Sequence, residues 1–146
     1  MNKYLYFISL LFFISCSEEQ FFVGDPVPKI SFQGLSSDRL KQFQDTLAIR
    51  IEYEDGDGDL GFLSADSLSL EVWDSRLSKP DFYYIPPMLP LSAKPTRISG
   101  TWQVKLKNLF LIGAGAQEQT QFQIRVKDRS GHWSNQIQTP SLVIEK

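Results

Sequence analysis

Apolar side chains recur at every second position in four separate stretches of this 146-residue chain. They are Leu47, Ile49, Ile51 and Tyr53 in 46–53, Leu68, Leu70 and Val72 in 67–72, Trp102, Val104 and Leu106 in 101–107, and Phe122, Ile124 and Val126 in 121–127. A period of two with polar or charged alternates is typical of strands that pack on one side only. The alternation therefore predicts an all-β domain of antiparallel strands around one core.

Three weaker stretches complete the expected strands: 29–33, 82–85 and 137–144. Pro140 interrupts the last of them, so we expect 137–144 to be an edge strand. Seven short antiparallel strands are typical of an immunoglobulin-like β-sandwich, here a single domain over 28–146, and a small closed barrel is the alternative. The one helix-like stretch is 36–44, where Leu40 and Phe43 are three residues apart, and it predicts a single helical turn in a loop.

The start of the chain has the features of a secretory leader. Lys3 supplies a positive charge, residues 4–14 form an apolar run, and Ser15 precedes Cys16, the only cysteine. Eleven helical residues cover about 16 Å, roughly half of a hydrocarbon core, so the run is too short for a stable transmembrane helix. We expect a signal peptide over 1–15 and a tether over 16–27.

Residues 13–16 (Phe-Ile-Ser-Cys) resemble a bacterial lipobox, although Phe13 stands where leucine is more usual. The resemblance implies that Cys16 is acylated, with chains such as palmitate, and becomes the first residue of the mature lipoprotein. Each buried CH₂ of such a chain contributes about 0.8 kcal/mol, so several chains give a firm membrane anchor. The alternative is an ordinary secretory signal with an incidental cysteine.

Directly after the cysteine, Ser17-Glu18-Glu19 is similar to the acidic export tag of Bacteroidota-type surface lipoproteins. This similarity implies an outer-membrane protein that faces the cell exterior. The alternative is a solvated polar tether on a lipoprotein that faces the periplasm.

The segment Glu54-Asp55-Gly56-Asp57-Gly58-Asp59-Leu60-Gly61 places three aspartates at alternate positions between glycines. Glycine permits the positive φ angles of a tight loop, and aspartates gathered around one point repel each other unless a cation neutralises them. Oxygen ligands on a flexible loop suit Ca²⁺, which takes six to eight oxygens at about 2.4 Å. The spacing imitates an EF-hand loop with Asp66 at its twelfth position, but Leu60 stands where that loop needs glycine, which excludes an EF-hand.

An immunoglobulin-like sandwich brings a fourth aspartate to the same place. If 46–53 and 121–127 are its second and sixth strands, the loops that follow them cluster at one pole. Asp128 then turns toward the acidic loop, and Asn135 can add an oxygen. We therefore predict a structural Ca²⁺ site of weak affinity, ~10⁻⁴ to 10⁻³ M, formed by Asp55, Asp57, Asp59 and Asp128. The alternative is a solvent-exposed turn in which Asp and Gly serve only backbone geometry.

Residues 52–61 and 126–135 together resemble a group of small Bacteroidota surface lipoproteins that carry a DGDGDLG loop. Residues 41–45 and the closing Thr139-Pro140 fit the same group. The resemblance implies a domain of the immunoglobulin or fibronectin type in a surface lipoprotein, and it brings no known activity.

Several features argue against catalysis and against nucleic acid as a partner. His132 is the only histidine and lies in a polar stretch, where a solvated turn residue is the simplest interpretation. No thiolate pair or histidine pair offers ligands for zinc. The net charge is −2 and no run of Lys or Arg is present, so nucleic acid is a poor partner. We therefore predict that the protein is not an enzyme.

A binding role remains, and the proline-rich stretch 82–91 is the place to expect it. Phe82, Tyr83 and Tyr84 beside rigid prolines can form a partner-binding or sugar-stacking patch. The alternative, which we favour, is that Phe82 and Tyr84 face the core. We predict an accessory or interaction subunit of an outer-membrane envelope complex with a protein partner, or else a free-standing surface module that binds glycan or host protein.

Overall fold

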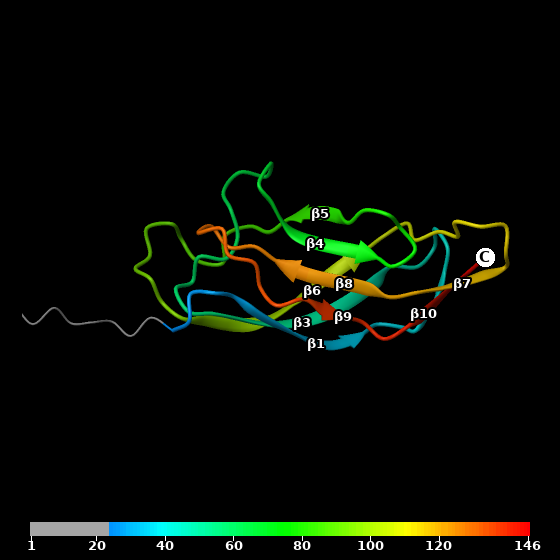
Figure 1. Cartoon of the computed structure of the whole chain (residues 1–146), viewed down its shortest axis with the longest axis horizontal. Helices are drawn as coiled ribbons and strands as arrows, with labels where there is room; N and C mark the ends of the chain where they lie inside the picture. Colours follow the sequence, from blue (N-terminus) through cyan, green and yellow to red (C-terminus); the bar gives the residue numbers. More distant parts are fainter. Residues whose placement is uncertain (1–23) are drawn as a thin grey trace, which may run out of the picture.

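The structure is a computed structural model that describes residues 24–146 (Figure 1). The predicted signal peptide over 1–15, the anchor at Cys16 and the tag at 17–19 lie outside the described residues. Residues 24–146 contain no helix that is long and apolar enough to cross a membrane.

The described residues form ten β-strands and no helix. The strands are β1 (Lys29–Leu35), β2 (Arg39–Lys41), β3 (Leu47–Asp55), β4 (Leu68–Asp74), β5 (Asp81–Tyr84), β6 (Ile98–Leu106), β7 (Gln117–Thr120), β8 (Phe122–Val126), β9 (Ile137–Gln138) and β10 (Leu142–Glu145).

Two antiparallel sheets make the sandwich, with strand orders β1-β3-β6 and β5-β4-β8-β9. In Figure 1, β4 and β5 lie above β1 and β3. A small third sheet, β2-β10-β7, lies at one end of the molecule, and the loop after β3 lies at the other end (Figure 1). The predicted all-β sandwich is confirmed, and its strands form separate sheets instead of one closed barrel.

The core lies between the two larger sheets and consists of the side chains that the alternation placed inward. Leu47, Ile49 and Ile51 of β3 have no exposed surface, and Phe122, Ile124 and Val126 of β8 are at most 2% exposed. The prediction is wrong for Leu68, which is 49% exposed. A bulge between Leu68 and Leu70 shifts the register of β4 against β5, so the alternation breaks at that point.

Residues 36–44 are not helical. They contain β2, which pairs in parallel with β10, and the side chain of Leu40 packs into the core. Phe43 has a φ of 59° in the turn that follows and is exposed. The strand β2 forms in place of the expected helical turn, because β10 supplies hydrogen-bond partners for its backbone. An example at the end of this pairing is the bond from Gln42 N to Glu145 O at 2.7 Å.

The C-terminal stretch 137–144 forms two strands instead of one, with Pro140 between them. β9 is an edge strand, as the proline predicted, but β10 is the central strand of the small sheet, which corrects the prediction for that half. Proline has no N–H for pairing, and the chain leaves one sheet and enters the other at this point.

The sandwich is closed along one side and open along the other. On the closed side, the Asn135 side chain accepts a bond from Ile30 N at 2.9 Å and donates one to Ile30 O at 2.8 Å. These bonds tie β1 to the segment that precedes β9. On the open side, β5 and β6 are the edge strands of their sheets. A groove lies between these two edges.

Candidate metal centre

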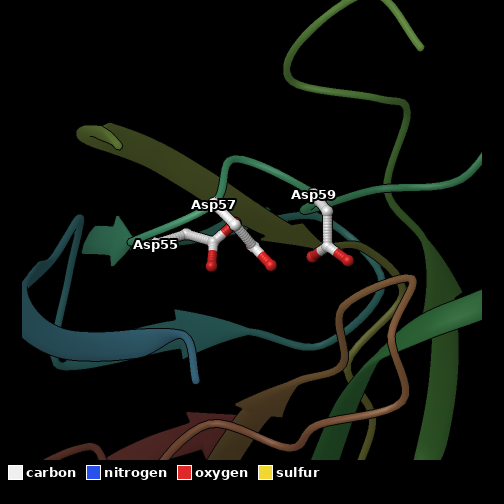
Figure 2. A group of neighbouring side chains, drawn as sticks. All are labelled: Asp55, Asp57 and Asp59. Carbon is white, nitrogen blue, oxygen red and sulfur yellow. The ribbon is translucent and has the colours of Figure 1, made fainter. Parts of the chain in front are cut away.

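The acidic loop, residues 55–61, begins at the last residue of β3. Asp55 is the end of that strand, and Asp57 and Asp59 follow in the turn. In Figure 2 the three side chains leave the loop on the same side, so their carboxylates face a common space. One oxygen from each carboxylate lies within 4.8 Å of the others. We call Asp55, Asp57 and Asp59 the acidic cluster.

The glycines of the acidic loop are needed because other backbone segments pass directly over them. A Cβ atom on Gly56 would lie 2.2 Å from Asp25 O, one on Gly58 would lie 2.4 Å from Thr96 O, and one on Gly61 would lie 2.1 Å from Pro86 O. Gly58 and Gly61 also have φ angles of +73° and +83°, which only glycine adopts at little cost. The loop is therefore packed under two other segments, one at Asp25 and one that contains Pro86 and Thr96, and is not a freely solvated turn.

Each aspartate of the acidic cluster has an oxygen without a partner. The Oδ1 atoms of Asp55, Asp57 and Asp59 are buried and accept no hydrogen bond from any residue of the described part of the chain. Asp55 has no exposed surface at all, and only its Oδ2 accepts a bond, from Leu60 N at 3.2 Å. Asp59 Oδ2 accepts bonds from Ser130 N and Oγ at 3.0 and 2.7 Å. Buried carboxylate oxygens without donors are costly, and a cation at this point would offset that cost.

Burial and mutual repulsion disfavour the ionised forms of these carboxyl groups. Burial, and after it the charges of Asp57 and Asp59, together raise the pKa of Asp55 from 3.8 to about 6. Burial also raises the pKa of Asp57, with smaller contributions from the charges of Asp59 and Asp128. A bound cation would reverse both effects, because it favours the ionised form of every ligand.

Asp128 lies at the same pole as the acidic loop, as the sandwich topology predicted. It forms an isolated antiparallel bridge with Leu60 and is fully buried. Its carboxylate does not join the group of three, because Oδ1 accepts a bond from His132 N at 2.7 Å and Oδ2 lies 2.9 Å from His132 Nδ1. Asp128 therefore adds negative charge beside the cluster and is held by His132.

Two other residues considered in the sequence are placed elsewhere. Asn135 uses its side chain on the backbone of Ile30 and ties the strands together. Asp66 is exposed, outside the acidic cluster, in agreement with the exclusion of an EF-hand.

The spacing of the acidic cluster suits one oxygen-loving cation. Ca²⁺ binds oxygens at about 2.3–2.6 Å, so two ligands on opposite sides of one ion are separated by about twice that distance. Oxygens within 4.8 Å of one another satisfy this limit. Three carboxylates leave several coordination positions for water or backbone oxygens, since Ca²⁺ takes six to eight ligands.

The aromatic residues of β5 do not face the core as we favoured. Phe82 is 44% exposed and Tyr83 is 38% exposed, because β5 is an edge strand with only β4 as its partner. Tyr84 is partly buried, and its hydroxyl donates to Phe62 O at 2.7 Å. Phe82 and Tyr83 are therefore available at the surface, and Tyr84 is available only in part.

Sequence reasoning missed the groove beside this patch. It has a volume of about 350 Å³ and lies between Tyr83–Pro86 on one side and Trp102–Lys105 on the other, with Leu70 and Met88 also in its lining. The alternation placed Trp102 inward but gave no indication that one side of the sandwich would be open. Such a feature depends on how the two sheets meet, which no local pattern encodes.

Comparisons with known proteins give no relative for this chain. No family model matches it, and neither a curated protein nor a solved structure does. The likeness to Bacteroidota surface lipoproteins therefore stays a prediction from the sequence.

Proposed function

We propose that the domain is a Ca²⁺-stabilised β-sandwich module, with the acidic cluster as the ligand set and Asp128 as a fourth negative charge beside it. The observation that carries this proposal is the convergence of three carboxylates, each of which has a buried Oδ1 atom with no hydrogen-bond donor within residues 24–146. A cation would satisfy all three at once and would cancel their repulsion. The proposed role of the ion is structural, because it would neutralise three carboxylates that the fold brings together in one loop.

Calorimetric melting in EDTA and in 10 mM CaCl₂ tests the site. With an affinity of ~10⁻⁴ to 10⁻³ M, this concentration is about 10 to 100 times Kd and stabilises the folded state by about 1.4 to 2.7 kcal/mol. For a domain of this size the melting temperature should rise by about 5 to 10 °C. An unchanged melting temperature would contradict the proposal.

We further propose that the domain is displayed on a lipid anchor at Cys16, on the outer face of the outer membrane. The support is the leader, the cysteine at its end and the Ser17-Glu18-Glu19 tag. Metabolic labelling with a palmitate analogue should mark the wild-type protein and not Cys16→Ser. Protease added to intact cells should then remove the domain, whereas a periplasmic protein would be protected.

We also propose that the protein is an interaction subunit of an envelope complex. Its contact surface is the patch of Phe82, Tyr83 and Tyr84, of which Phe82 and Tyr83 are exposed. The partner is a protein that adds an extended strand to the free edge of β5. Aromatic residues on an unpaired strand edge favour this mode, since backbone bonds supply affinity and side chains supply specificity. Binding of glycan to the aromatic rings is the alternative.

Co-purification after gentle detergent extraction distinguishes the two. The variant Phe82→Ser/Tyr83→Ser should lose a stoichiometric protein partner that Ile112→Ser, a control at a similarly exposed residue, retains. Recovery of an isolated monomer from the wild type, together with binding to a glycan array, would favour the alternative.

A further inference from the structure

The groove on the open side of the sandwich shares a wall with the acidic loop. Ile85, Pro86 and Met88 line the groove. Phe62 N donates to Ile85 O at 2.9 Å, and Met88 N donates to Leu60 O at 3.1 Å. These bonds fasten the first half of the segment 85–96 to the loop that carries the aspartates.

The second half of that segment is held by the same loop. Thr96 N donates to Asp57 O at 3.1 Å. The close approaches of Pro86 O to Gly61 and of Thr96 O to Gly58, described above, leave little space between the two segments. Segment 85–96 has no strand of its own, so its position depends largely on these contacts with residues 57–62.

The groove and the acidic loop also meet at Tyr84. Its ring lines the groove, and its hydroxyl donates to Phe62 O just after the loop. A displacement of residues 57–62 would therefore disturb the groove from two sides, through Tyr84 on β5 and through Met88 on the following segment.

We propose that the cation acts as a latch: by neutralising the acidic cluster it fixes residues 57–62, and these hold segment 85–96 in place as the wall of the groove. This inference rests on the proposed Ca²⁺ site. Without the ion, the ionised carboxylates repel one another and the acidic loop expands. The bonds from Met88 N and Thr96 N then break, and the groove loses one of its walls. The groove thus has both walls in the presence of calcium and lacks the wall formed by segment 85–96 in its absence.

Hydrogen–deuterium exchange of the folded protein in EDTA and in 10 mM CaCl₂ tests the latch. Peptides that cover 85–97 should exchange at least tenfold more slowly with calcium. Peptides that cover β10, at the opposite end of the molecule, should slow by a smaller factor, because they report only the global stabilisation by calcium. Asp57→Asn should remove most of the difference at 1 mM CaCl₂, and the exposed Asp66→Asn should keep it.

The outcomes separate the latch from the site itself. If calcium raises the melting temperature but leaves the exchange of 85–97 unchanged, the latch is wrong and the site stands. If calcium changes neither, the site is wrong as well. Equal slowing of exchange in β10 and in 85–97 would also overturn the latch, because it would reflect global stabilisation only.

Discussion

Replacing Asp55 with asparagine should change the stability of the protein in opposite directions with and without calcium. The substitution keeps the shape of the side chain and an oxygen that can accept the bond from Leu60 N, but it removes the charge. In the metal-free protein that charge is unfavourable, because Asp55 has no exposed surface and stands beside two other carboxylates. With calcium bound, the same charge is a ligand.

The magnitude follows from the raised pKa of Asp55. The pKa rises from 3.8 in the unfolded chain to about 6 in the folded protein, a difference of about 2.2. Since one pKa unit corresponds to about 1.36 kcal/mol, ionised Asp55 costs the metal-free protein about 3 kcal/mol at pH 7. Asp55→Asn should therefore stabilise the metal-free protein by up to about 3 kcal/mol and should abolish most of the stabilisation by calcium.

Urea denaturation at pH 7, in EDTA and in 10 mM CaCl₂, measures both effects. Asp66→Asn is the matched control, because Asp66 follows the same loop but is exposed, and it should change neither value by more than about 0.5 kcal/mol. If Asp55→Asn destabilises the protein equally in both buffers, Asp55 serves the fold through its hydrogen bonds and the reasoning from charge is refuted.

Three further predictions concern pH and two structural contacts. Because the pKa of Asp55 is raised, the metal-free protein should lose stability as the pH rises from about 4 through 6. The stabilisation by calcium should disappear over the same interval when the pH is lowered. Calorimetry from about pH 4 to 8 measures both effects, and a calcium effect that persists at about pH 4 would contradict the assignment. Arg76→Met should lower the free energy of unfolding in urea by about 3 kcal/mol, because it leaves the buried Asp74 carboxylate without the guanidinium 2.6 Å away. Arg39→Met, at an exposed ion pair, should lower it by less than about 1 kcal/mol. Equal losses in the two variants would contradict the stated difference between a buried and an exposed pair. Gly61→Ala should lower the free energy of unfolding by about 2 to 4 kcal/mol, because of the positive φ of Gly61 and the clash of the new Cβ with Pro86 O. Gly115→Ala should change it by no more than about 0.5 kcal/mol. An unchanged stability of Gly61→Ala would show that Pro86 O does not lie close against the acidic loop.

The strands of the core could be predicted because burial on one face imposes a local period of two. Leu47, Ile49 and Ile51 follow that rule, and so do the inward residues of β8. The approach of the three aspartates could also be predicted, since alternate residues in one short loop are never far apart. Asp128 was placed at the same pole from strand parity and topology.

The parts that could not be predicted depend on contacts between distant segments. The parallel pairing of β2 with β10 joins residues about a hundred positions apart, and the bulge at Leu68 arises from register against β5. The inward orientation that we favoured for Phe82 fails because β5 lies at a sheet edge. The segments that cover Gly56, Gly58 and Gly61 come from both directions along the chain, and nothing in the loop itself identifies them.

A crystal structure of residues 24–146 grown in 10 mM CaCl₂, with anomalous data to identify the ion, tests the central claim most directly. We predict one calcium ion within about 2.3–2.6 Å of an oxygen from each of Asp55, Asp57 and Asp59. An acidic cluster without an ion at that concentration, or with its carboxylates turned apart toward solvent, would contradict the account.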